Sequence, residues 1–415
     1  MENSTEQLIR ESAAANFASV RCLLAAGASE RLLAWSTLHH AVALGTLAQV
    51  DAALRESADL EQRDHAQRTA LLLAVQVGDL EKMELLLLYG AEIQVRAGGK
   101  PAIFFALEQA DLSLFDWMLS ADFPLGLDDR GVSLLAHALE HGHYDSVRQR
   151  LDARFADSHR QLASGKSSEL VRLKESLIAG ADPRGLDYSL QRLLIGLPES
   201  SAKLYSATAE DYLAAAEPRF GQKNPELRKE KFLYAMLHSG VDGYTAGIRY
   251  NPELGRHRGP IWNAHRHGQS ITFLPDGRIL QIGGEHEDWY DPDFCIYNDV
   301  FVHYPDGRHE IYSYPPSVFP PTDFHSATLV GPWIWIIGCA GYKDQRCDMT
   351  PVYLLNTETL KIRRLQISGE SPGWIHGHQA LLTSKDTIRI EIDRPRHQVR
   401  ELDIRKLRWK EPEAD

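Results

Sequence analysis

The chain has 415 residues, of which 43% are apolar and 25% charged, and this composition is typical of a globular protein with two or three buried cores. The formal net charge of −12 argues against a broad nucleic-acid surface, which needs clustered Lys and Arg, and favours a basic protein as the partner. The N-terminal segment has no signal-peptide pattern and no apolar run is long enough to span a membrane, so we expect a cytoplasmic protein without membrane contact.

A period of 32 or 33 residues runs through the first third of the chain. The segments STLHHA, TALLLA, PAIFFA and SLLAHA begin at positions 36, 69, 101 and 133, and each ends in an alanine. A leucine follows each alanine by 13 residues, at Leu54, Leu87, Leu119 and Leu151. This pattern predicts pairs of helices, in which the small residue allows close packing and the leucine of the second helix faces the next pair.

The second segment continues as RTALLLAVQVGDLEKMELLLLYGAEI and resembles the ankyrin repeat, with a T-x-L-x-x-A opening and a Leu-Leu-x-x-Gly-Ala ending. The ending recurs before the first segment and after residue 170, so the resemblance covers about residues 3–182. Three places depart from the ankyrin motif: its Pro is replaced by Ala70, its Gly by Ala110, and its Gly-Ala by Ala153–Arg154. The resemblance implies an α-helical solenoid over residues 1–155 that binds proteins through its turn tips and inner helices. The alternative is an array that only supports a second domain.

The expected solenoid is acidic. Residues 1–155 contain 22 Asp and Glu against 13 Lys and Arg, a difference of −9 out of −12 for the whole chain. This excess either serves solubility or steers a basic partner.

Residues 156–248 keep a helical pattern, with capping residues ahead of apolar stripes. We expect a continuation of the helices and a connector, with Ser206 or Thr208 capping one helix. Three tyrosines lie on the apolar stripes and are expected in the core: Tyr205, Tyr212 and Tyr234.

Residues 249–415 change to short apolar strands bounded by turn residues, and two PDGR tetrapeptides, at 275–278 and 305–308, predict hairpin tips. Segments beginning at His267, His325 and His376 recur at spacings of 58 and 51, which suggests units of four strands.

The segment FHSATLVGPWIWIIGCAGY resembles the start of a kelch repeat, in which the second strand runs into a glycine pair. The pair is intact as Gly283–Gly284 and altered to Gly338–Cys339, and the motif Trp is kept as Trp409. The resemblance covers about residues 260–410 and implies an all-β domain of three kelch-like blades. Three blades are too few to close a propeller. Residues 200–260 complete the domain, or it is an open wedge packed on the array, or two chains form a dimer through it.

Candidate catalytic groups are few. The peptide GESPG satisfies G-x-S-x-G at Ser371, but a strand rather than a helix is expected after it, so we do not expect a nucleophile there. Six histidines could gather near one axis and hold a metal ion, although hydrogen-bonding roles suit them better: His265, His267, His286, His325, His376 and His378. The four cysteines have neither disulfide-framework density nor zinc-site spacing, and we interpret them as reduced thiols.

An acidic and aromatic segment, EHEDWYDPDF at residues 285–294, follows the first glycine pair. Loops in this place commonly bind partners, and the odd-position pattern of a calcium loop is absent. We predict partner contacts at six residues: Glu285, Glu287, Asp288, Trp289, Tyr290 and Asp291. The alternative is a solvated acidic loop.

Taken together, the sequence predicts an α+β multidomain protein with an ankyrin-like array at 1–155, a helical connector at 156–248 and a kelch-like β-domain at 249–415. We expect a non-catalytic protein that binds a protein partner, with no cofactor and no metal site. Two other classes stay open, namely an inhibitor or immunity protein that neutralises a toxin or effector enzyme, and an enzyme with its site in the propeller mouth.

Overall fold

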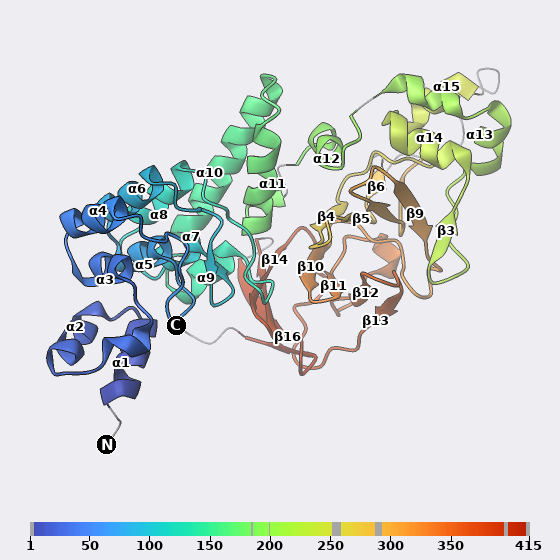
Figure 1. Cartoon of the computed structure of the whole chain (residues 1–415). Coiled ribbons are helices and arrows are strands. Elements are labelled where there is room, and N and C mark those ends of the chain that lie inside the picture. Colours follow the sequence, from blue (N-terminus) through green and yellow to red (C-terminus); the bar gives the residue numbers. More distant parts are fainter. Residues whose placement is uncertain are drawn as a thin grey trace. The chain divides into compact units, whose positions relative to one another are not determined.

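The computed structural model describes residues 4–183, 186–198, 200–250, 259–286, 293–393 and 397–411. It is an α+β structure, with helices in the N-terminal half and antiparallel sheets in the C-terminal half (Figure 1). The chain forms two compact units. Unit 1 comprises Met1–Asp157 and Glu175–Ala181, and unit 2 comprises Ser158–Lys174 and Asp182–Asp415.

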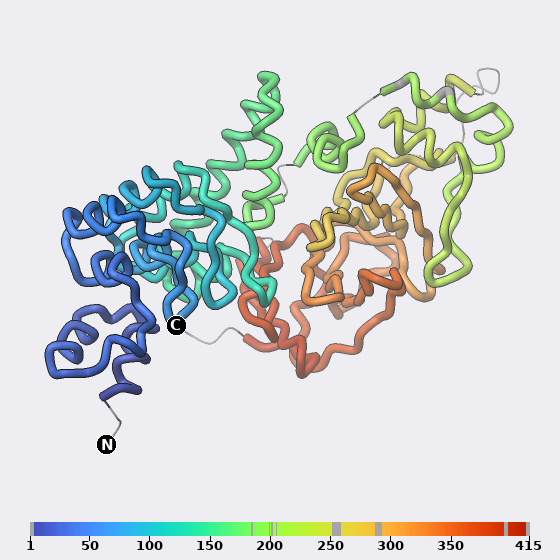
Figure 2. Tube along the Cα trace, in the orientation of Figure 1, coloured from blue at the N-terminus to red at the C-terminus, as the bar shows by residue number. Residues whose placement is uncertain are grey.

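Unit 1 consists mainly of helices that follow one another in short pairs. The four expected segments give the pairs α3 (Thr37–Leu44) and α4 (Leu47–Arg55), α5 (Ala70–Val77) and α6 (Leu80–Leu88), α7 (Ala102–Ala106) and α8 (Ser113–Ser120), and α9 (Leu134–Glu140) and α10 (Tyr144–Ala163). The flanking elements are α1 (Ser4–Ala13), α2 (Phe17–Ala25), the 3-10 helix η1 (Glu30–Leu33) and α11 (Glu169–Ala179), and the short strands β1 (Arg96–Ala97) and β2 (Lys100–Pro101) pair before α7. Helix α5 contacts α3 on one side and α7 on the other, so consecutive pairs stack (Figure 2).

Hydroxyl side chains start most of the first helices of these pairs. Ser36, Thr69 and Ser133 each precede a helix, and each hydroxyl accepts a hydrogen bond from the backbone N–H three residues later. The third segment has Pro101 at this place, with no side-chain cap. Its helix α7 has five residues, against eight, eight and seven in the other three. Loss of the cap therefore coincides with the shortest helix.

The alanines that define the period are all buried, as expected: Ala41, Ala74, Ala106 and Ala138. The leucines follow the expectation less well. Leu54 and Leu151 are buried, whereas Leu87 and Leu119 are half-buried. Leu86 and Met118, with no exposed surface, take the inward position instead. The expected register is thus one residue too late in α6 and α8, because their inward faces are centred on the preceding residue.

The second segment of unit 2, from Asp182, begins with further helices: α12 (Tyr188–Leu194), the 3-10 helix η3 (Ser201–Ser206), α13 (Ala209–Ala215), α14 (Lys231–Ser239) and α15 (Gly243–Tyr250). Thr208, and not Ser206, caps α13 by accepting from the backbone N–H of Asp211. Tyr212 is buried and Tyr234 is half-buried against the same core, while the side chain of Tyr205 lies outside the described part.

Three antiparallel sheets follow in chain order. The first, in the order β3-β9-β8-β5-β4, contains β3 (Glu226–Arg228), β4 (Ser270–Phe273), β5 (Ile279–Ile282), β8 (Val300–His303) and β9 (His309–Ser313). The second contains β10 (Ser326–Val330), β11 (Trp333–Ile337), β12 (Val352–Asn356) and β13 (Ile362–Arg364). The third contains β14 (Gln379–Ser384), β15 (Thr387–Ile392), β16 (Gln398–Asp403) and β17 (Arg408–Lys410). Between β5 and β8 in the sequence, β6 (Glu285–His286) and β7 (Cys295–Ile296) form a separate two-stranded sheet.

Both PDGR tetrapeptides form hairpin tips, because the first connects the paired strands β4 and β5 and the second connects β8 and β9. Gly277 and Gly307 have φ values of 85° and 83°, which glycine adopts without strain. The expected unit starts need a correction. The first strands β4, β10 and β14 begin at Ser270, Ser326 and Gln379, so His325 corresponds to His378 rather than to His376. In the first sheet the corresponding residue is Gln269, two positions after His267.

The segment before the sheets covers the first of them. Strand β3 pairs with β9, and helices α13 to α15 share a buried core with that sheet, including Phe232, Phe301 and Ile311. Asn224 also joins the outer strand of the second sheet, donating to the carbonyl of Ile362 at 2.7 Å and accepting from its N–H at 2.9 Å. The described residues between 200 and 250 therefore contribute to the β-region. Within the described ranges, the strands form separate sheets and no closed barrel. None of the described helices is long and apolar enough to cross a membrane.

Candidate functional site

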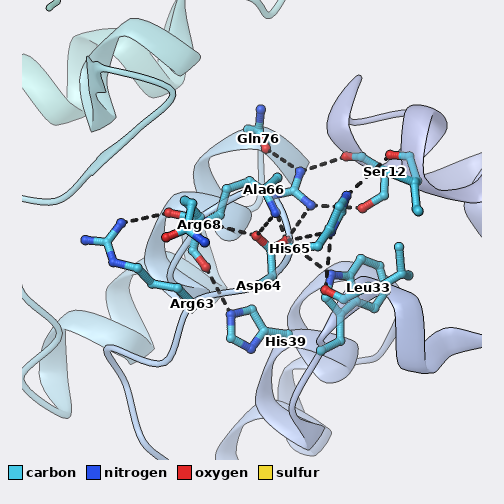
Figure 3. Close-up of polar contacts among 12 residues, drawn as sticks. Ser12, Leu33, His39, Arg63, Asp64, His65, Ala66, Arg68 and Gln76 are labelled. Carbon is cyan, nitrogen blue, oxygen red and sulfur yellow. Dashed lines mark hydrogen bonds and ion pairs between the residues drawn. The ribbon is translucent and has the colours of Figure 1, made fainter.

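A buried ion pair fixes the turn ahead of α5 (Figure 3). Arg68 donates to Oδ2 of Asp64 from Nη2 at 2.6 Å and from Nε at 2.9 Å, while Oδ1 of Asp64 accepts from the backbone of Ala66 and Arg68. The same guanidinium donates to the carbonyl and hydroxyl oxygens of Ser12 and to Oε1 of Gln76. Burial alone would raise the pKa of Asp64, but the bonds and charge of Arg68 outweigh it and lower that pKa. These groups satisfy one another, so the network holds the turn rather than a ligand.

A second turn of unit 1 is fixed in the same way. Oδ1 of Asp128 accepts from the backbone N–H groups of Arg130 and Val132, both at 2.8 Å. Arg96 donates to the carbonyl of Leu127 and to Asp129 of the same turn. Side chains that point outward from these turns are therefore held by a rigid backbone, which lowers the entropy cost of binding.

Four carboxylates gather on the turns that follow α4 and α6, and we call them the acidic edge: Glu56, Asp59, Glu61 and Glu92. All four are exposed, and among the described residues none of them forms an ion pair. Oε1 of Glu61 accepts from the backbone N–H of Glu92 at 2.9 Å, so the two turns touch. Two basic side chains close in sequence are occupied, since Arg55 pairs with Asp51 and Arg63 donates to backbone carbonyls.

Two large side chains project beside the acidic edge at the end of α6. Leu88 is 81% exposed and Tyr89 is 40% exposed. The hydroxyl of Tyr89 donates to Oδ1 of Asp51 at 3.2 Å, which places its ring against α4. Glu92 follows Tyr89 by three residues. An exposed apolar pair bordered by unpaired carboxylates suits a protein surface that offers an apolar anchor surrounded by basic groups.

The acidic segment predicted to contact a partner is described only at its ends. Glu285 lies in β6, half-buried, and its backbone pairs with that of Ile296 in β7 and of His267. The other predicted contacts lie outside the described residues: Glu287, Asp288, Trp289, Tyr290 and Asp291. Their prediction stays as the sequence made it.

Ser371 lies in the connection between β13 and β14, so strands flank it on both sides. Its Oγ atom accepts from the backbone N–H groups of Thr350 at 3.0 Å and Gly373 at 3.2 Å. The hydroxyl thus organises a turn, and the strand–helix context of a nucleophile elbow is missing.

The six candidate histidines of the β-region do not meet in one group of metal ligands within the described part of the chain. Nε2 of His325 lies 2.8 Å from Oγ of Ser270, and Nε2 of His378 lies 2.9 Å from Oγ of Ser326. Nδ1 of His286 contacts the hydroxyl of Tyr297 at 2.7 Å. The remaining three are His265, whose ring stacks on that of Tyr188 with a centroid distance of 3.8 Å, His267, whose ring centroid lies 5.5 Å from that of His265, and the exposed His376.

A pocket of about 450 Å³ lies between the helical segment of unit 2 and its first sheet. Its polar lining is formed by His238, His303, His309 and the exposed Lys203. Its apolar lining includes Leu194, Ile195, Leu197, Ile279, Tyr304 and Pro305. The three histidine rings touch in sequence, with centroid distances of 5.4 Å from His238 to His309 and 5.1 Å from His309 to His303.

Hydrogen bonds fix the tautomers in this pocket. Nε2 of Gln281 donates to Oε1 of Gln191 at 3.3 Å, which leaves Oε1 of Gln281 to accept from Nε2 of His303 at 2.9 Å. Nδ1 of His303 is then an acceptor, and Nδ1–H of His309 donates to it at 2.8 Å. Burial lowers the pKa of His309 to about 4 and that of His303 well below its usual value. Both rings are neutral at pH 7 and weak as bases, so the arrangement suits hydrogen bonding better than proton transfer.

A further group of potential ligands lies in unit 1. Ligand atoms of Glu108, His137 and His141 lie within 4.8 Å of one another. Among the described residues, no other group of three or more His, Cys, Asp or Glu side chains comes as close together. The four-residue spacing of the two histidines was visible in the sequence, whereas Glu108 reaches them only through the stacking of two helix pairs.

The sequence analysis also did not predict the exposed apolar side chains beside the acidic edge. Leu88 and Tyr89 belong to an unbroken apolar run, LLLLY, in which no sequence signal separates inward from outward residues. Comparison with known proteins gives no assignment, since no protein-family model matches the sequence and no curated protein has a significantly similar sequence.

Proposed function

We propose that the chain is a non-catalytic protein-binding protein, built from an ankyrin-like solenoid and a kelch-like β-domain, whose acidic edge holds a basic protein partner. The observation that carries this proposal is the pairing of exposed Leu88 and Tyr89 with four carboxylates that have no ion-pair partner among the described residues. Single exposed apolar residues are common, but here two adjoin a concentrated charge on rigid turns.

The two kinds of residue have different tasks in this proposal. The carboxylates attract a basic partner over about one Debye length, roughly 8 Å at physiological salt, and thereby raise the association rate. Leu88 and Tyr89 lose their exposed surface on binding and slow dissociation. The repeat-like stacking of α3, α5 and α7, and the capping at Ser36 and Thr69, support the solenoid part of the proposal.

The kelch-like part rests on three successive antiparallel sheets, of five, four and four strands, whose first strands along residues 270–384 contact one another, β10 with both β4 and β14. The acidic segment 285–294 is proposed as a second contact to the same partner, with Trp289 and Tyr290 as apolar anchors.

An affinity capture with matched variants tests the proposal. The full chain, tagged and purified, is used to capture proteins from the native cells, and the captured protein is then purified for direct binding. The variant E56Q/D59N/E61Q/E92Q should bind it at least tenfold more weakly at physiological salt. The control E210Q/D344N/E358Q/E370Q makes the same charge change at exposed positions of unit 2 and should bind like the wild type.

Leu88→Ser should cost about 2 kcal/mol or more of binding free energy if this residue is an interface anchor. Equal loss of binding in the two charge variants would mean that only net charge matters, and would refute a site at the acidic edge. Unchanged binding in both the charge variant and Leu88→Ser would refute it as well.

A further inference from the structure

Two neighbouring helix pairs of unit 1 bring three metal-ligating side chains together. His137 lies in α9, and His141 is the C-cap of the same helix, so a four-residue spacing puts both rings on one face, 4.5 Å apart. Glu108 follows α7 of the preceding pair. Nε2 of His137 lies 4.0 Å from Oε1 of Glu108.

His137 is buried, and the described residues offer its ring no hydrogen bond. Its side chain is 1% exposed, and neither ring nitrogen has a hydrogen-bond partner among those residues. A buried polar group without a partner normally costs about 1–3 kcal/mol, and such groups are rare in native proteins. The Nε2 atom of His137 faces the carboxylate of Glu108, and its Nδ1 atom faces that of Glu140.

We propose that Glu108, His137 and His141 bind a divalent transition-metal ion of the zinc class. Two imidazoles and a carboxylate form a ligand set that zinc accepts, with a fourth position left for water or a partner group. Bonds of about 2.1 Å in a tetrahedron place ligand atoms about 3.4 Å apart. The present separations, within 4.8 Å, therefore need to shorten by at most about 1.4 Å. The exposed side chains of Glu108 and His141 can make that movement while His137 stays in place.

Glu140 lies next to the ring nitrogen of His137 that does not face Glu108. Its Oε2 atom lies 3.4 Å from Nδ1 of His137, on the side of the ring away from Glu108. A metal-bound histidine usually donates its other ring N–H to a carboxylate, which fixes the tautomer and increases ligand basicity. Binding through Nε2 would give that nitrogen a partner, and a small shift of the exposed Glu140 side chain would let its carboxylate accept a hydrogen bond from Nδ1–H.

Lys100 competes with the ion. Its Nζ atom lies 3.2 Å from Oε1 of Glu108, so a cation must displace this ion pair. Lys100 is therefore expected to weaken metal binding, and its removal should strengthen it. The ion would link α9 to the segment after α7, the short helix without a side-chain cap, and so stabilise the stacking of these two pairs.

Calorimetric titration of the full chain with ZnCl₂, and visible absorption of the Co²⁺ complex, test this proposal. The wild type should bind one equivalent and show the ligand-field bands of four-coordinate Co²⁺. His141→Ala and Glu108→Gln, both at exposed positions, should each weaken binding about tenfold or more, Glu140→Gln about tenfold, and Lys100→Gln should strengthen it. His397→Ala, at an exposed histidine of unit 2, is the control and should change nothing.

The protein melting temperature should rise with Zn²⁺ in the wild type and not in His141→Ala. Absence of a one-equivalent site would overturn the proposal, and so would binding that survives both His141→Ala and Glu108→Gln with circular dichroism unchanged. This site is independent of the acidic edge, so loss of partner binding in the charge variant and loss of metal binding in His141→Ala report on separate claims.

Discussion

Nε2 of His325, the residue before β10, lies 2.8 Å from Oγ of Ser270, the first residue of β4, and so joins the first strands of two sheets. The next pair of sheets repeats the contact, with Nε2 of His378 at 2.9 Å from Oγ of Ser326. Both rings are buried. Burial lowers the pKa of His325 to about 3 and that of His378 to about 4, so the two sheet contacts are made by neutral imidazoles.

These two histidines predict a loss of stability in acid. In the folded state their pKa values lie below the unfolded value of 6.5, so only the unfolded chain takes up the protons as the pH falls below 6.5. Their contribution is complete above that pH and is lost progressively down to the folded pKa values, at about 1 kcal/mol per pH unit for each histidine. Chemical denaturation between pH 7.5 and 4.5 measures this slope.

Other groups titrate in the same range, so a matched variant isolates the effect. The first sheet has Gln269 in the place of these histidines, and H325Q/H378Q introduces the same neutral side chain in the other two. The double variant should lose less stability between pH 7.5 and 4.5 than the wild type. An identical pH slope in the two proteins would show that these rings are already protonated, or freely accessible, in the folded state.

Arg68→Ala should destabilise unit 1 by about 3–5 kcal/mol, because it leaves the buried carboxylate of Asp64 without its charged partner. The double change Arg68→Ala/Asp64→Ala should recover part of the loss, since it removes the uncompensated charge. Urea denaturation followed by helical circular dichroism measures both. Arg55→Ala removes a solvent-exposed ion pair with Asp51 and should leave the midpoint unchanged. Equal effects of the two arginine changes would contradict the buried network.

Three successive leucines of α6 give a graded test of its orientation. Leu86 has no exposed surface, Leu87 is half-buried and Leu88 is 81% exposed. Leu86→Ala should cost about 2–5 kcal/mol of unfolding free energy, Leu87→Ala less, and Leu88→Ala almost nothing. The three denaturation midpoints should therefore fall in that order. A larger loss at Leu87 than at Leu86 would restore the helix register expected from the sequence period.

Local signals in the sequence anticipated the parts of the fold that depend on local chemistry. The hydroxyl of Thr208 and the glycines of the PDGR tips act within a few residues, and the structure has the expected cap and turns there. The inward face of α6 was missed by one residue, because every residue from Leu85 to Leu88 is leucine and only packing against α4 and α5 decides between them.

Contacts between distant segments could not be obtained from the sequence. Glu108 lies 29 residues before His137, and no spacing rule connects them. The sequence comparison aligned His325 with His267, because both are histidines. The strand starts show that His325 corresponds to Gln269 instead. A contribution of residues 200–260 was one of three possibilities. Strand β3 and the buried core that α14 shares with the first sheet show such a contribution, and the open wedge and the dimer stay predictions.

The association rate of the partner with immobilised full-length protein, measured as salt is raised, tests the central claim most directly. The account predicts that the rate falls steeply for the wild type and only weakly for E56Q/D59N/E61Q/E92Q, while Leu88→Ser mainly raises the dissociation rate. An association rate that does not change with salt, together with a dissociation rate that Leu88→Ser does not change, would contradict binding at the acidic edge.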